Sequence, residues 1–414
     1  MIGPNYTPPP TFTIGPPPTL PPPNTNATLP PVVTVGPSPT PGPVLQKALM
    51  GIQIHSFLTD QQWQQMLNFA KDLGVGWVKI QVSWKDMEIS KNTFSINQYQ
   101  ALILNIQRTR GQGFKTLLSI AKAPSWARPA GATTEDGPSD NPQDFADFVA
   151  KLVRDAKPEA IDAIEIWNEA NLIREWRGKP ISGVEYMKYF KAAYDVIQTE
   201  QKAQPAFNDP NHRIMVITAG PAPTGTSDSS LDDRLWVQQL YAGGLGAYGD
   251  DVALGAHPYG WANPPDATCC KAQPGITGWY ENRVFYFRDT LDDYRQKMLR
   301  AEGAKHKIWV TEFGWATYDG LKRSNGSAAS IGSDSGWQNL INQQQQADYV
   351  LRAFYIAQQP PYYDFLGPMM LWNLNYGIIP QLIDDGREEA GFSLLDSSWT
   401  PRPVYFKLKN APKQ

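Results

Sequence analysis

Ile164-Glu165-Ile166-Trp167-Asn168-Glu169, followed by Ala170-Asn171, is the most informative stretch of this chain for the fold. A short apolar run that favours β structure ends in an Asn-Glu pair, and a loop then begins. A second run, Ile308-Trp309-Val310-Thr311-Glu312, has the same form and leads into Phe313-Gly314-Trp315. Strands that present polar side chains at their carboxyl ends are typical of a (β/α)8 barrel, whose functional residues lie at that rim.

The rest of the chain fits the same architecture, because strand-like and helix-like runs alternate from about Leu45 onward. Strands are predicted at 50–55, 77–82, 116–120, 164–169, 214–218, 252–257, 308–312 and 369–372. Helices are predicted at 60–73, 96–110, 142–155, 184–201, 232–242, 280–300, 343–358 and 401–409. The expected fold is therefore α/β, a single (β/α)8 TIM barrel over residues 45–414.

Residues 1–44 differ in composition from the rest of the chain. Three proline triplets, at 8–10, 16–18 and 21–23, are separated by Thr, Asn and Gly, without any charged residue. Such a segment cannot bury a core, so we expect a disordered or polyproline-II linker. Pro/Thr-rich tethers often join an exported enzyme to an anchor or another module, whereas the alternative is a terminus without a role. We therefore expect an extracellular or cell-surface protein, although residues 1–4 show no signal peptide.

The charge and the cysteines exclude several classes of protein. A net charge of −3 and a pI near 5.9 argue against nucleic acid or an anionic membrane as partner. No apolar run approaches the ~18 residues of a membrane span. The only cysteines, Cys269 and Cys270, are adjacent, and a bonded pair and two free thiols are both open. No His/Cys/Asp cluster suggests a metal or other cofactor, so none is expected.

Two glutamates at separate strand ends match the requirement of glycoside hydrolysis for a pair of carboxyl groups. The pair would be Glu169 and Glu312, and the Asn168 amide beside Glu169 could hydrogen-bond a sugar 2-OH. The alternative is a barrel with polar rim residues and no activity.

A family resemblance rests on these motifs. Residues 167–169 and 311–315 resemble the paired signatures of clan A glycoside hydrolases, and the similarity extends over nearly everything after the linker, including 391–396 and 401–405. The chain is most similar to family 39, particularly its bacterial members acting on exopolysaccharides, with family 5 as the alternative. The resemblance implies a retaining barrel enzyme in which Glu169 is the acid/base, Asn168 its 2-OH partner and Glu312 the nucleophile.

Further rim residues are candidates for substrate binding. His257 and Tyr259 resemble the clan's pair that flanks the reacting sugar, and a Tyr there often hydrogen-bonds the nucleophile. Trp372 ends the eighth strand, where the clan places a platform beneath the sugar. The alternatives are a structural loop pair and a core tryptophan. His55 ends the first strand and is either a sugar contact or a structural histidine.

Five tryptophans lie in or beside the expected rim loops: Trp84, Trp126, Trp176, Trp261 and Trp315. Sugar rings present flat C–H faces that stack on aromatic side chains, so we expect two or three of these residues to line a cleft. Trp84, Trp126 and Trp315 are the candidates for substrate binding.

Lys79 and Glu165 lie inside strands, with the inward parity expected of the rim residues. A lone buried charge is too costly, so the two are predicted to pair inside the barrel. Their role would be structural, with an electrostatic effect on Glu169.

The function expected from these features is hydrolysis of an extracellular β-linked polysaccharide by a retaining double displacement. Endo action is favoured because the aromatic residues are spread over several loops. The alternatives are an exo-acting enzyme similar to β-xylosidases and β-glucosidases, transglycosylation at the same site, and a non-catalytic carbohydrate-binding barrel.

Overall fold

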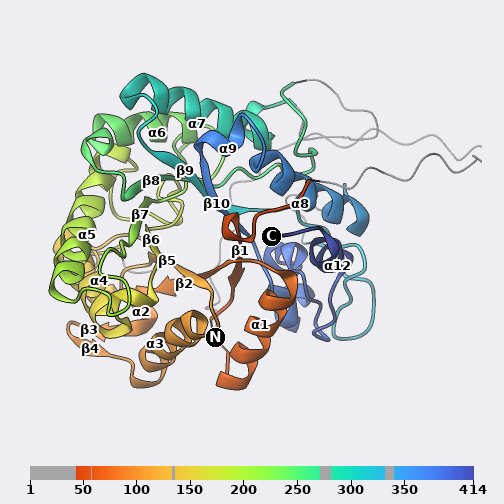
Figure 1. The fold of residues 1–414 in the computed structure, drawn as a ribbon, viewed down its shortest axis with the longest axis horizontal. Helices are drawn as coiled ribbons and strands as arrows, with labels where there is room; N and C mark the ends of the chain where they lie inside the picture. Colours follow the sequence, from red (N-terminus) through yellow and green to blue (C-terminus); the bar gives the residue numbers. More distant parts are fainter. Residues whose placement is uncertain (1–42, 57, 133–135, 271–280, 332–339) are drawn as a thin grey trace, which may run out of the picture.

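The computed structural model describes residues 43–56, 58–132, 136–270, 281–331 and 340–414. Eight parallel strands close into a barrel in the order β1-β10-β9-β8-β7-β6-β5-β2, which confirms the predicted TIM barrel (Figure 1). They are β1 (Met50–Ile54), β2 (Trp77–Ser83), β5 (Lys115–Ala121), β6 (Ala163–Ile166), β7 (Met215–Thr218), β8 (Val252–Ala256), β9 (Lys307–Phe313) and β10 (Leu366–Leu371). A hairpin that the sequence did not predict, β3 (Glu88–Ser90) with β4 (Thr93–Phe94), lies outside the barrel.

Helices surround the barrel (Figure 1). The longer ones are α1 (Asp60–Leu73), α3 (Ile96–Gly111), α4 (Pro142–Ala156), α5 (Gly183–Ala203), α6 (Asp233–Ala242), α7 (Phe287–Glu302), α8 (Gln343–Ala357) and α12 (Pro403–Asn410). Short helices are α2 (Trp84–Met87), α9 (Tyr362–Phe365), α10 (Pro380–Asp384) and α11 (Glu388–Phe392). The helix predicted from residue 280 begins only at Phe287, because Asn282 caps a separate 3-10 turn at Arg283–Phe285.

Local sequence explains why the first helix has the bounds that were predicted. Thr59 and Gln62 form a reciprocal capping box at the start of α1, and Gly74 ends the helix in a left-handed conformation with φ of 70°. The apolar face of α1 is buried at Trp63, Met66, Leu67, Ala70 and Leu73. This face attaches the helix to the barrel.

The barrel interior consists of an apolar layer and, nearer the rim, a polar layer. Seven strands contribute the apolar layer of Trp77, Leu117, Ala163, Ile217, Ala253, Trp309 and Met370. On β1 the corresponding residue is Gly51, where a Cβ atom would lie 2.2 Å from the Met370 sulfur. Two residues further along their strands lie Gln53, Lys79, Ser119, Glu165 and Thr311, all buried. Side-chain alternation therefore places this polar layer directly below the rim.

The two ends of the described part of the chain lie side by side. The Leu45 amide donates to Pro412 O at 2.9 Å, and the Gln414 amide donates to Leu45 O at 2.9 Å. The linker predicted at 1–44 lies, except for its last two residues, outside the described residues. Cys269 and Cys270, for which both states were open, form a disulfide. None of the described helices combines the length and apolar composition that crossing a membrane requires.

Candidate active site

The two candidate carboxylates reach the rim in different ways. Glu312 lies within β9, whereas Glu169 follows β6 through a turn in which Trp167 and Glu169 have φ of 75° and 39°. Positive φ is unfavourable for residues other than glycine, so the surroundings must hold this turn. The buried Trp167 indole donates to Glu175 O at 3.0 Å, and the Glu169 amide donates to Gly220 O at 3.2 Å.

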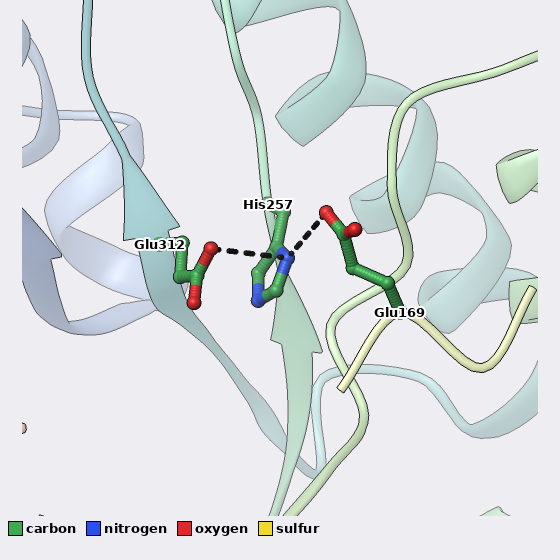
Figure 2. A group of neighbouring side chains, drawn as sticks. All are labelled: Glu169, His257 and Glu312. Atoms are coloured by element: carbon green, nitrogen blue, oxygen red, sulfur yellow. Dashed lines mark hydrogen bonds and ion pairs between the residues drawn. The ribbon is translucent and has the colours of Figure 1, made fainter. Parts of the chain in front are cut away.

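His257 lies between the two carboxylates, as Figure 2 shows. Its Nδ1 is 3.2 Å from Glu169 Oε1 and 3.8 Å from Glu312 Oε2. One carboxylate oxygen of Glu169 and one of Glu312 lie within 4.8 Å of each other. Both glutamates are 7% exposed, so each is almost buried but still reachable from the rim. The structure thus brings together three residues that the sequence singled out.

Glu312 is surrounded by hydrogen-bond donors. Lys79 Nζ lies 2.8 Å from its Oε1, and the Tyr259 hydroxyl donates to its Oε2 at 3.0 Å. When the Gln53 side-chain amide is oriented so that both its nitrogen and its oxygen have hydrogen-bond partners, the nitrogen donates to Glu312 Oε1 at 3.3 Å. The Gln53 oxygen then accepts from Trp372 Nε1 at 3.1 Å. These contacts fix the orientation of the Glu312 carboxylate.

Glu169 has two cationic neighbours. Arg174 Nη2 donates to its Oε2 at 2.9 Å, and His257 Nδ1 faces its Oε1. Burial raises the pKa of Glu169, but the His257 hydrogen bond and the Arg174 charge outweigh burial and lower it to about 2. In this structure Glu169 is therefore a carboxylate.

With Glu169 ionised, the partners of His257 require a proton on both ring nitrogens. Nδ1 faces Glu169, which accepts only. Nε2 lies 3.1 Å from Thr311 Oγ1, whose own hydrogen is donated to Glu165 Oε1 at 2.6 Å. Nε2 must therefore donate to Thr311. Burial lowers the pKa of His257, but the carboxylates of Glu312, Glu165 and Glu169 outweigh burial and raise it to about 9.

The predicted pairing of Lys79 and Glu165 is confirmed, with Lys79 Nζ 3.2 Å from Glu165 Oε2 and both side chains fully buried. The prediction did not include the contact of Lys79 with Glu312. Burial lowers the pKa of Lys79, but the two carboxylates outweigh burial and raise it. The pair therefore acts on Glu312 directly, and on Glu169 only through His257.

Some predicted binding residues lie near the carboxylates, but their contacts with a sugar stay predictions. Trp372 is half-buried and packs on Tyr259 and Phe392, with ring centroids 6.1 and 4.8 Å away. The His55 ring lies edge-on to Tyr376, with a centroid distance of 4.9 Å, and burial lowers its pKa to about 4. The Asn168 oxygen is buried without a hydrogen-bond partner among the described residues.

The expectation for the loop tryptophans needs correction. Trp84, Trp176 and Trp315 are completely or almost completely buried and cannot offer a face to a ligand. Trp84 packs between the helices, stacked on Phe148, and the Trp315 indole donates to Asn263 O at 2.8 Å. Trp126 and Trp261 are half-buried. A position at a strand end does not determine whether a side chain points into the mouth of the barrel or into the helix layer.

Three residues around the carboxylates were not predicted: Arg174, Gln53 and Thr311. Gln53 and Thr311 have the inward parity that identified Lys79 and Glu165, so the same argument could have found them. Arg174 lies in an irregular loop, and no periodic signal marks it.

Glu169, His257 and Glu312 could in principle hold a cation, because one potential ligand atom of each lies within 4.8 Å of the others. Each carboxylate, however, already has a cationic partner, Lys79 at 2.8 Å and Arg174 at 2.9 Å. His257 has no lone pair available while both nitrogens are protonated. The donor set therefore fits proton transfer better than metal binding.

Comparisons with known proteins show the shared fold. No protein-family model and no curated protein matches the sequence. A family 39 glycoside hydrolase from Bacteroides cellulosilyticus WH2 superposes with a TM-score of 0.60 at 18% identity, over 89% of this chain and 64% of that chain. This chain thus spans less than two thirds of that neighbour's length.

Two other solved structures are similar over most of both chains. A GH5_18 from Bifidobacterium longum subsp. infantis has a TM-score of 0.57 at 12% identity, over 89% of this chain and 78% of that chain. The GH53 catalytic domain of Ignisphaera aggregans has a TM-score of 0.54 at 15% identity, over 91% and 99%. At these identities the likeness establishes the barrel fold.

Proposed function

We propose that this chain is a retaining β-glycosidase that acts on a carbohydrate by double displacement. The observation that carries the proposal is the spacing of Glu169 and Glu312, whose closest carboxylate oxygens lie within 4.8 Å. Retaining enzymes place their carboxyl groups about 5–5.5 Å apart, whereas inverting enzymes need roughly 6.5–9.5 Å to fit a water molecule. The structural neighbours include glycoside hydrolases, and this similarity and the motifs similar to family 39 support the same proposal.

The surroundings of the two carboxylates support a different role for each. Glu312, beside Lys79 and Tyr259, is the nucleophile that attacks the anomeric carbon. Glu169 gives a proton to the leaving oxygen and then takes one from water. Asn168, beside Glu169, is the proposed partner of the sugar 2-OH, and Trp372 the platform beneath the ring.

For the substrate, we propose a β-linked polysaccharide cleaved internally. Half-buried tryptophans occur at three strand ends, in Trp126 after β5, Trp261 after β8 and Trp372 after β10, which favours an extended site over a single pocket. Cleavage from chain ends, as in β-xylosidases or β-glucosidases, is the alternative. The uncharged Pro/Thr-rich segment supports action outside the cell, tethered to an anchor or another module.

The test is hydrolysis of a panel of β-linked polysaccharides and aryl β-glycosides by the wild type, Glu169→Gln and Glu312→Gln. We expect activity on at least one substrate, lost in both variants, with oligosaccharide products if cleavage is internal. Activity that survives either substitution would refute the mechanism. Binding of oligosaccharides without any turnover would identify a carbohydrate-binding barrel instead.

A further inference from the structure

A continuous line of buried charges joins the two carboxylates beneath the rim. From Glu312 Oε1 the line passes to Lys79 Nζ at 2.8 Å and from there to Glu165 Oε2 at 3.2 Å. Glu165 Oε1 is 3.5 Å from His257 Nε2, and His257 Nδ1 is 3.2 Å from Glu169 Oε1. Lys79, Glu165 and His257 are all 0% exposed.

This arrangement meets a chemical requirement that Glu169 alone does not. An acid/base residue must deliver a proton, yet Glu169 is held as a carboxylate by Arg174 and His257. His257 Nδ1, which lies 3.2 Å from Glu169 Oε1, carries a proton that can pass to this oxygen. Because Nε2 donates to Thr311, Nδ1 is the nitrogen that gains or loses the second proton, and the negative charge of Glu165 behind the ring favours keeping that proton.

We propose that Lys79 and Glu165 are positioning residues that act on both carboxylates. Lys79 pairs with the Glu312 carboxylate and orients it, and Glu165 holds on His257 the proton that Glu169 delivers. The proposal rests on the glycosidase function proposed above and adds to it the source of the catalytic proton.

The proton balance closes over the two steps. In the first step the Nδ1 proton passes to Glu169 and then to the leaving oxygen, while Glu312 bonds to the anomeric carbon and the glycosidic bond breaks. His257 is then neutral and Glu312 is esterified. In the second step Glu169 takes a proton from the attacking water and returns it to His257, and the new C–O bond releases the Glu312 carboxylate.

Other charged groups also face these residues. Arg174 contacts Glu169 from the loop after β6, and Tyr259 contacts Glu312 from the loop after β8. The charges of Glu175 and Glu388 are also coupled to Glu169. All of these groups remain in the variants proposed below, so a change in a pH profile can be assigned to the residue replaced.

The test uses the pH profile of kcat/KM. We expect Glu165 to affect the alkaline limb of this profile and Lys79 to affect the acid limb. In Glu165→Gln, His257 loses a carboxylate and holds its proton less firmly, so the alkaline limb should move down by about one pH unit or more. In Lys79→Met, the positive charge 2.8 Å from Glu312 Oε1 is removed, so the acid limb should move up. A purely structural role would lower activity or Tm and leave both limbs in place.

Asp233→Asn is the matched control. Asp233 is a fully buried carboxylate on α6 that pairs with Arg234, outside the barrel interior. Its replacement removes a buried charge and should lower Tm without moving either limb. Limbs that move equally in Asp233→Asn and Glu165→Gln would overturn the proposal.

A second measurement needs neither Lys79→Met nor Glu165→Gln to fold. The chain has 4 histidines, so the ring ¹⁵N signals of the wild type can be followed by NMR, with His257 identified by the signal lost in His257→Asn. We expect the His257 signals to be those of an imidazolium at pH 7.5. A neutral ring at that pH would overturn the proposal.

The two levels of inference fail differently. A wild type without hydrolysis, or an active Glu312→Gln, refutes the proposed function. If Glu312→Gln abolishes activity, but Glu165→Gln and Lys79→Met have the same acid and alkaline limbs as the wild type, only the proposed role of Lys79 and Glu165 is refuted.

Discussion

The candidate carboxylates differ most in the cations that neutralise them. Glu312 faces Lys79, a fully buried ammonium on a rigid barrel strand. Glu169 faces Arg174, whose side chain is 31% exposed and comes from a loop. A fixed cation suits a nucleophile that must stay ionised, whereas a cation that can move away suits a group that must change its protonation.

Tyr259→Phe tests the hydrogen bond on Glu312, the proposed nucleophile. The phenol donates to Glu312 Oε2 at 3.0 Å, and a hydrogen bond to a charged group contributes about 1.5–3 kcal/mol. We expect kcat/KM for an aryl glycoside to fall roughly 10- to 100-fold with little change in Tm. An unchanged rate would mean that the hydroxyl does not orient Glu312.

Arg174→Gln tests the cation beside Glu169, the proposed acid/base. The Arg174 charge lowers the pKa of Glu169, so its removal raises that pKa and lets the Glu169–His257 pair hold its proton to higher pH. We expect the alkaline limb of the kcat/KM profile to move up, opposite to Glu165→Gln. Arg177→Gln, in the same loop, is the control and should leave the limb in place. A limb that moves down in Arg174→Gln would contradict the assignment.

The sequence predicted some of these residues and not others, for physical reasons. Glu312 lies in a buried strand, and Glu169, His257 and Tyr259 follow such strands, so the barrel fold brings them together. Arg174 reaches Glu169 from an irregular loop, whose path depends on tertiary contacts that no periodic pattern records.

At the level of elements, the loop after β6 depends on one asparagine. Asn171 Nδ2 donates to Ala222 O at 2.9 Å and to Leu231 O at 3.0 Å, and its Oδ1 accepts from the Ala222 amide at 2.9 Å. Asn171 is fully buried and lies two residues after Glu169. It therefore ties the end of β6 to the loop after β7.

Asn171→Ala should disturb both stability and the site. Each buried polar group left without a partner costs about 1–3 kcal/mol, so we expect a lower Tm and at least a roughly tenfold loss of kcat/KM. Asn171→Asp keeps the acceptor and loses the donors, and should be intermediate. Full activity with a lowered Tm would show that this loop does not position Glu169.

Long elements were more predictable than short ones. The helix at 60–73 has both a capping box and five apolar residues at helical spacing, and its bounds were predicted correctly. The hairpin of β3 and β4 was missed, because three- and two-residue strands are too short for alternation to show. The late start of α7 depends on the side-chain cap at Asn282, which hydrophobic periodicity does not record.

For the whole molecule, the buried charges predict how stability varies with pH. Interactions that lower the pKa of Glu169 from 4.5 to about 2 stabilise the fold above pH 4.5 and are lost as the pH falls through 2. Interactions that raise the pKa of His257 from 6.5 to about 9 stabilise it below pH 6.5 and are lost as the pH rises through 9.

The carboxyl groups of Glu175 and Glu388 shift the pH of maximum stability to lower values. Burial raises the pKa of Glu175 and Glu388 from 4.5 to about 7, so stability is also lost between these values as the pH rises. We expect Tm to be highest near pH 5 and to fall towards pH 9. Calorimetry across this range checks the prediction, and Glu175→Gln should flatten the decline between pH 4.5 and 7. A maximum above pH 8 would contradict these ionisation states.

The architecture of the whole molecule was readable because eight apolar runs alternate with amphipathic helices, and one closed barrel accommodates them. Which tryptophans face the mouth of the barrel was less predictable. Whether Trp84 or Trp126 faces it depends on local packing, and burial removes Trp84 from the candidates.

The covalent intermediate provides the most direct test of the central claim, that Glu312 is the nucleophile of a retaining glycosidase. Activated 2-deoxy-2-fluoro β-glycosides, chosen from the sugars that the substrate panel identifies, should inactivate the enzyme, and peptide mass spectrometry should find the sugar on Glu312. Inactivation should not occur in Glu312→Gln. A sugar attached to Glu169, or a first product with inverted anomeric configuration, would contradict the account.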